Sequence, residues 1–149
     1  MIACFVFALT ACGSKPAGND ASDTPVSSNE VGSNLPSLEE YFNSDIMQGV
    51  VSAVKEQYTE EGISADLYAE GDELHYEFRM DDVVTSEEER PAIAEQLKSS
   101  TEASAESYYD TAVQAKKSVC NDVVIVVVSF YDGDGNELYT QSFSSADAQ

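Results

Sequence analysis

Residues 63–80, I-S-A-D-L-Y-A-E-G-D-E-L-H-Y-E-F-R-M, alternate apolar and polar side chains on both sides of Gly71 and Asp72. Such alternation predicts two half-buried β-strands, and a glycine at the first position of a two-residue turn predicts that they form a hairpin. When Glu70 lies opposite Glu73, one face of the hairpin is apolar and the other is polar. The apolar pairs are Ala69–Leu74, Leu67–Tyr76 and Ala65–Phe78, and the polar pairs are Tyr68–His75 and Asp66–Glu77. The hairpin therefore suits a sheet that helices cover on one side.

A helix is expected on the amino-terminal side of this hairpin. Ser37 to Glu40, S-L-E-E, is a capping box, and the residues after it carry apolar side chains at helical spacing as far as Tyr58. Gly62 then ends the helix, because glycine readily adopts the left-handed conformation found at helix termini.

A second, longer helix is expected after the hairpin. Another capping box, Ser86 to Glu89, precedes an apolar stripe at helical spacing that runs to Val119. Pro91 lies late for a first helical turn, so the start of this helix can slip toward Arg90 or the helix can kink there.

The β-branched run V-V-I-V-V-V-S-F-Y at 123–131 predicts a central strand that is buried on much of both faces. After D-G-D-G-N at 132–136, residues 137–143 are its expected hairpin partner. The element order is thus α-β-β-α-β-β, and the simplest packing is an α+β two-layer sandwich. We expect a four-stranded, mainly antiparallel sheet with two helices. If strands 74–80 and 123–131 are neighbours, the long helix is a right-handed crossover between parallel strands.

Composition limits the function classes. The 149 residues are 42% apolar, which provides one modest core and not two. Twenty-eight acidic and seven basic residues give a net charge of −21, which argues against nucleic acid as a partner and against direct attraction to an anionic bilayer. No stretch reaches the ~18 consecutive apolar residues that a spanning helix needs.

The amino terminus indicates that the protein is exported from the cytoplasm. Residues 1–11 are almost wholly apolar, and L-T-A-C-G at 9–13 is the small-residue context of a secretory cleavage site. It departs from the usual pattern because no Lys or Arg precedes Lys15, and an ordinary buried apolar end is the alternative. Residues 12–34 are expected to form a disordered tether, residues 35–143 the domain and residues 144–149 a flexible tail.

The segment L-T-A-C resembles a bacterial lipobox. This resemblance implies that residues 1–11 are a lipoprotein signal peptide and that Cys12 becomes the first mature residue, with lipid on its thiol. The membrane is then a partner through that lipid. The expected location is the outer, extracellular face of the bacterial cytoplasmic membrane.

The whole pattern resembles a family of small lipoproteins of Gram-positive gut bacteria whose domain has no known function. The lipobox, the tether, S-L-E-E-Y at 37–41, Y-A-E-G-D at 68–72 and V-V-V-S-F-Y-D-G-D-G-N-E-L-Y at 126–139 carry the resemblance. It covers nearly the entire chain and implies no catalytic residue.

One loop has the beginning of a calcium motif. Asp132, Asp134 and Asn136 place oxygen ligands at alternate positions. The match then fails, because Glu137 stands where the motif needs glycine and Phe143 where it needs a bidentate Glu. Asp-Gly between two strands also predicts a simple hairpin turn. Calcium is therefore only a weak candidate, and no other cofactor is expected.

The sequence offers little for catalysis. His75 is the only histidine, and a solvent-facing strand residue in a cross-strand pair is its simplest interpretation. Cys120 is expected to be a small buried hydrophobe beside the apolar strand, with a reactive thiol as the alternative. Asp66 opposite Glu77 is the one carboxylate pair that the register predicts. We therefore do not expect an enzyme.

The remaining candidate is a surface for a partner. If the helices cover the face bearing Leu67 and Tyr76, the strand at 123–131 leaves one of two apolar sets on the opposite face. One set is Ile125, Val127, Ser129 and Tyr131, and the other is Val124, Val126, Val128 and Phe130. Beside Tyr68 and His75, either set would form a contact site unless another part of the chain buries it.

These observations predict a lipid-anchored, extracellular, non-catalytic binding module of the bacterial cell envelope. Its partner would be an envelope protein, a peptide or a wall component, and the negative charge favours a basic one. The alternative functions are a carboxylate-dependent envelope hydrolase and a calcium-responsive structural module.

Overall fold

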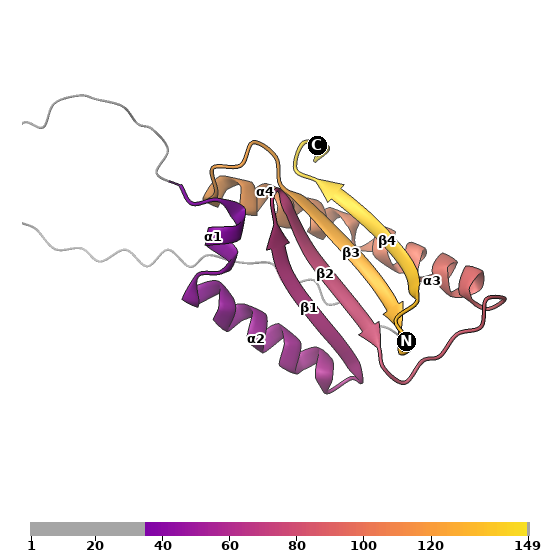
Figure 1. The fold of residues 1–149 in the computed structure, drawn as a ribbon. Coiled ribbons are helices and arrows are strands. Elements are labelled where there is room, and N and C mark those ends of the chain that lie inside the picture. The colour runs from indigo at the N-terminus through magenta and orange to yellow at the C-terminus, as the bar shows by residue number, and fades with distance from the viewer. Residues whose placement is uncertain (1–34, 149) are drawn as a thin grey trace, which may run out of the picture.

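The computed structural model describes residues 35–148. The predicted signal peptide, the tether and Cys12 lie outside the described residues. The elements are α1 (Leu38–Phe42), α2 (Asp45–Thr59), β1 (Ile63–Glu70), β2 (Glu73–Met80), α3 (Arg90–Ala103), α4 (Ala105–Ser118), β3 (Ile125–Asp132) and β4 (Glu137–Ser144). The predicted α+β class is confirmed (Figure 1). No described helix is long and apolar enough to cross a membrane.

The four strands form one sheet in the order β1-β2-β3-β4. The β1–β2 hairpin has the predicted register, with Ala65, Leu67 and Ala69 opposite Phe78, Tyr76 and Leu74. β2 and β3 are parallel neighbours, whereas β3 and β4 are antiparallel. The sheet is therefore mixed rather than mainly antiparallel, and α3 and α4 together are the crossover from β2 to β3.

The expectation of two helices is wrong, because each predicted helix is broken into two. The Ser37 capping box forms, with the Glu40 N–H donating to Ser37 Oγ and the Ser37 N–H donating to Glu40 Oε2. Four residues on, the chain turns at Ser44, whose hydroxyl donates to the Tyr41 carbonyl at 2.6 Å. This serine is then the N-cap residue of α2.

The second break falls at Ser104, which ends α3 and precedes α4. The start of α3 also differs from the simplest expectation. The Ser86 N–H and hydroxyl both donate to the Glu89 carboxylate, which lowers the pKa of Glu89. The helix nevertheless begins at Arg90, with Pro91 in its first turn, because proline is well placed there and not further inside.

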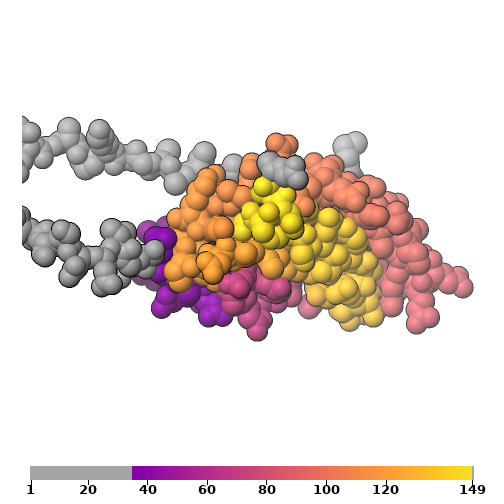
Figure 2. Space-filling model, turned by 90° about the horizontal axis from the view of Figure 1, so that it is seen from above, coloured from indigo at the N-terminus to yellow at the C-terminus, as the bar shows by residue number. Residues whose placement is uncertain are grey.

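One face of the sheet carries the core. Every strand contributes to it, and the buried members are Ala65, Leu67, Leu74, Phe78, Val126, Val128 and Phe143. α1 and α2 pack on β1, and α3 and α4 pack on β4 and β3. Phe143 is fully buried between the rings of Tyr108 and Tyr109 of α4. The space-filling view shows α1, in indigo, toward one end of the molecule and α3, in salmon, at the other (Figure 2).

Asn121 connects three separate segments. Its Oδ1 accepts from the Leu38 N–H at 2.8 Å, and its amide donates to the Gly71 carbonyl and the Asp72 carboxylate in the β1–β2 turn. The neighbouring Cys120 N–H donates to the Pro36 carbonyl at 2.9 Å. These bonds fix the start of α1 against the end of the sheet.

Asp132 is a buried carboxylate at the end of β3. It accepts from the Thr85 hydroxyl at 2.6 Å and from the backbone and side-chain amides of Asn136. These hydrogen bonds, that of Thr85 foremost, hold the pKa of Asp132 well below its usual range. Next to it, the Gly133 N–H donates to the Val83 carbonyl at 2.7 Å, and a Cβ at Gly133 would collide with the Asp81 carbonyl. The β3–β4 turn thus anchors the loop that leads into α3.

We expect Asp132→Asn to lower the melting temperature by several degrees at pH 7, because a neutral amide accepts the Thr85 and Asn136 hydrogen bonds more weakly. Since the folded-state pKa is depressed, the stabilisation is complete above the unfolded-state pKa of about 3.9 and is lost below it. Thermal melts from pH 7 to pH 3 should therefore show the wild-type advantage narrow as the pH falls below about 4.

Asp134→Asn is the matched control, because Asp134 is exposed in the same loop and the change in net charge is the same. An equal loss of melting temperature in both variants would show that the Asp132 hydrogen bonds do not stabilise the loop.

Candidate functional site

The register places all five predicted surface residues on the face of the sheet opposite the helices. Tyr68, His75 and Val127 lie side by side in one row across β1, β2 and β3. Ile125 and Tyr131 share their strand and face with Val127. The alternate set lies on the helix side, where Val124, Val126 and Val128 are fully buried. The structure thus resolves the choice that the apolar sequence of β3 left open.

This face is less apolar than an exposed Ile125–Tyr131 stripe would be. Val127 is 8% exposed and Ser129 5%, so neighbouring side chains leave only the ends of the stripe open. Ile125 and Tyr131 are half-buried. The most exposed large side chain of the set is Tyr68, at 38%.

Tyr68 of the edge strand β1 and His75 of β2 form a stacked pair on this face. Their ring centroids are 4.6 Å apart and the rings are inclined by 9°. The Tyr68 hydroxyl donates to Glu77 Oε1 at 2.8 Å, and this bond is the main reason that the pKa of Tyr68 rises to about 12. The two stacked rings together form a single aromatic surface.

His75 has an incompletely satisfied ring. Its Nε2 lies 3.1 Å from Glu73 Oε2, yet the geometry is not that of a hydrogen bond, and this buried nitrogen has no hydrogen-bond partner among residues 35–148. The two side chains are therefore close to each other but are not joined by a directed hydrogen bond.

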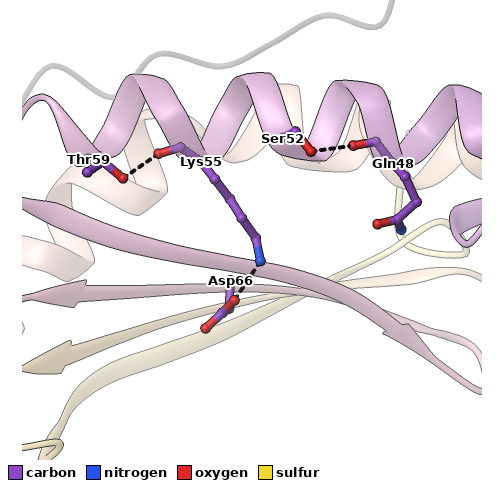
Figure 3. A network of polar contacts seen from close by, with 5 residues as sticks. All are labelled: Gln48, Ser52, Lys55, Thr59 and Asp66. Carbon is purple, nitrogen blue, oxygen red and sulfur yellow. Dashed lines mark hydrogen bonds and ion pairs between the residues drawn. The ribbon is translucent and has the colours of Figure 1, made fainter.

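Carboxylates surround the aromatic pair. Strand alternation places Asp66, Glu70, Glu73 and Glu77 on this face. Arg79 of β2 is a cation on the same face. Lys55 of α2 reaches past the edge of β1 and pairs with Asp66 Oδ1 at 2.7 Å (Figure 3). Asp66 lies opposite Glu77, as predicted. Each carboxylate has its own partner, because Lys55 pairs with Asp66 and the Tyr68 hydroxyl donates to Glu77.

Of the predicted calcium residues, Asp132 and Asn136 are hydrogen-bonded to each other, and Asp134 is not part of that group of hydrogen bonds. Both Asp132 oxygens accept hydrogen bonds, the Asn136 amide donates to Asp132, and Asp134 is exposed. Within residues 35–148 there is no group of three or more His, Cys, Asp or Glu side chains that could hold a metal ion. Asp132 instead has the structural role described above.

Cys120 is exposed, so the expectation that it is a buried hydrophobe is wrong. The strand begins only at Ile125, and the intervening segment follows the surface near Pro36. Cys120 is therefore not buried together with the apolar strand that follows it.

A hollow on the helix side was not predicted. It has a volume of about 240 Å³ and lies between α1 and α2 on one side and α4 on the other. Apolar positions at helical spacing identify the inner faces of these helices, but they do not reveal how far apart the helices lie. The sequence therefore carried no signal for it.

Comparison with known proteins adds a family and no activity. No curated protein and no solved structure matches the chain. The family model of a domain of unknown function, DUF4854, matches residues 38–143, which span the elements from α1 to β4 almost completely. The chain therefore belongs to the DUF4854 family.

Proposed function

We propose that this chain is a non-catalytic binding module of the bacterial cell envelope, held at the outer face of the cytoplasmic membrane by lipid on Cys12. Its ligand is a basic protein segment that lies across the sheet face bearing Tyr68 and His75. The observation that carries the proposal is this face, which has a stacked aromatic pair among four carboxylates and which none of the described helices covers.

Charge supports a basic partner. The face carries four carboxylates against Arg79, and the whole chain has a net charge of −21. Such a field attracts and orients a cationic segment, and it repels acidic ones. The paired rings of Tyr68 and His75 offer a rigid apolar surface on which aliphatic stems of Lys and Arg pack.

The competing functions have less support. A carboxylate-dependent hydrolase needs a proton donor and a base that act together on one bond, and Asp66 and Glu77 each have another partner. A calcium-responsive module needs ligands that are free to turn toward the ion, and Asp132 is committed to Thr85 and Asn136.

Cys12→Ser in the full chain tests the anchor. In a bacterial host that processes lipoproteins, we expect the wild-type chain in the membrane fraction, labelled by a clickable fatty acid, and the variant unlabelled and released from membranes. Lipid chains provide the attachment, and serine has no thiol to carry them. Membrane retention of an unlabelled variant would contradict this anchor.

Removal of two carboxylates tests the sheet face. The probe is a fluorescein-labelled Lys-Tyr-Lys-Tyr-Lys peptide, and its binding to the full chain is followed by fluorescence anisotropy. We expect Glu73→Gln with Glu77→Gln to weaken binding several-fold at low salt, because each exposed ion pair contributes about 0.2–1 kcal/mol. Binding should also fall as NaCl rises.

The matched control is Glu87→Gln with Glu88→Gln, which removes the same charge from exposed positions in the β2–α3 loop. It should leave the affinity nearly unchanged. Equal losses from both double variants would mean that only the net charge attracts the peptide, and the proposed site would be wrong.

A further inference from the structure

His75 has a buried ring nitrogen without a partner. Among residues 35–148, its Nε2 is the one buried side-chain nitrogen or oxygen atom that makes no hydrogen bond. The whole side chain is only 16% exposed. A buried polar atom that is left unpaired costs free energy, so such atoms are rare in folded proteins and often belong to a site.

A carboxylate oxygen lies beside this nitrogen. Glu73 Oε2 is 3.1 Å from His75 Nε2, which suits a hydrogen bond in length but not in direction. Glu73 is 48% exposed and lies on the open face, so its carboxylate can turn toward the ring without disturbing the core. With a proton on Nε2, the two side chains can then form a charge-assisted hydrogen bond, which is one of the stronger kinds.

Tyr68 also suits a protonated imidazole. The two rings are stacked with their centroids 4.6 Å apart, and the face of an aromatic ring attracts a cation at this distance. The Tyr68 hydroxyl donates to Glu77, and this bond is the main reason that the pKa of Tyr68 rises to about 12. Tyr68 therefore stays neutral across the pH range in which an imidazole ordinarily gains its proton.

Carboxylates surround His75 on the sheet face. Asp66 and Glu70 of β1 share this face with Glu73 and Glu77 of its own strand. The nearest positions of β3, at 125, 127 and 129, carry uncharged side chains. A proton gained by His75 therefore puts a positive charge among four carboxylates.

The other titratable side chains near the pair are of kinds that ordinarily titrate elsewhere. Lys55 of α2 is paired with Asp66, and Arg79 lies further along β2, opposite Tyr131. Carboxylates ordinarily titrate near pH 4, tyrosine near pH 10 and Lys and Arg above pH 10. His75 is the only histidine of the chain, so it is the side chain of this face whose charge is expected to change near neutral pH.

We propose that His75 and Glu73 make the sheet face a pH-dependent binding site. At pH 8 the ring is uncharged, and the Glu73 carboxylate is free to bind a cationic group of the basic segment. As the pH falls toward about 5.5, the imidazolium pairs with Glu73 and takes the place of that cationic group. The basic segment is then released. The effect on affinity rests on the proposed function, whereas the pairing of the two side chains does not.

A metal ion is the other common partner of an imidazole nitrogen. Metal sites in proteins ordinarily use three or four protein ligands, and residues 35–148 contain no group of three that could supply them. A proton needs only His75 and Glu73, which already lie 3.1 Å apart.

A basic peptide tests the effect on affinity. The probe is Lys-Tyr-Lys-Tyr-Lys labelled with tetramethylrhodamine, and its binding to the full chain is followed by fluorescence anisotropy at pH 8 and pH 5.5 at equal low ionic strength. We expect the wild-type affinity to fall about threefold at the lower pH, since one exposed ion pair is worth up to a factor of about five. In His75→Phe, which keeps a ring against Tyr68 but cannot take up a proton, we expect no such fall.

Glu87→Gln with Glu88→Gln is the matched control, because it removes two exposed carboxylates from the β2–α3 loop. It should keep the full pH dependence of the wild type. An equal fall in the wild type and in His75→Phe would overturn the proposal, because another group would then carry the pH dependence. Equal wild-type affinity at both pH values would overturn it as well.

A second measurement needs no ligand. The chain has one histidine, so in the ¹⁵N-labelled full chain without a histidine tag every imidazole signal belongs to His75. At pH 5.5 we expect an Nε2–H resonance, because burial and the bond to Glu73 slow its exchange with water, and we expect Glu73→Ala to remove it. Absence of this resonance in the wild type, or its persistence in Glu73→Ala, would overturn the proposal.

The two measurements separate failure of this inference from failure of the proposed function. If the peptide binds at neither pH while the Glu73-dependent resonance is present, the basic ligand is wrong and the proton-dependent pair is supported. If the peptide binds at pH 8 through Glu73 and Glu77 while the resonance is absent, the proposed function is supported and the inference is wrong.

Discussion

The parallel pairing of β2 with β3 is the constraint on which the rest of the structure depends. Two parallel neighbours cannot be joined by a tight turn, so the chain must cross the sheet between Met80 and Ile125. The crossing segment is α3 and α4, which pack on the same side as α1 and α2. All the described helices are therefore on one side, and the opposite face of the sheet is left with side chains alone.

The same pairing fixes which residues each face carries. β3 is apolar at nearly every position, so its own sequence is compatible with either orientation. Opposite β2, the pairs Leu74–Val126 and Tyr76–Val128 bring the apolar residues of both strands to the helix side. His75 and Val127 then follow on the other side by strand alternation. The pairing of β2 with β3 thus determines which residues form the core and which form the candidate surface.

Local patterns predicted the local parts of this fold. The hairpin register follows from alternation over 63–80, and the Ser37 cap from a four-residue motif. The breaks at Ser44 and Ser104 were missed because apolar spacing continues through both. Asp132 resembles the start of a calcium loop, but Thr85, 47 residues earlier, donates to it. The exposure of Cys120 and the hollow between α1, α2 and α4 likewise depend on how distant segments pack. No short window of sequence contains that information.

The hydrogen bonds around Asn121 also determine where a force on the amino end of the domain is carried. The described chain enters at Leu35, and the first bonds beyond that point join Pro36 to Cys120 and Leu38 to Asn121. Glu39 then accepts from the Gly71 N–H at 3.0 Å. A pull on the amino end is consequently borne first by the Pro36–Cys120 and Leu38–Asn121 hydrogen bonds, at the very start of α1. Since α1 also borders the hollow beside α2 and α4, the same hydrogen bonds hold that border in place when the amino end is pulled.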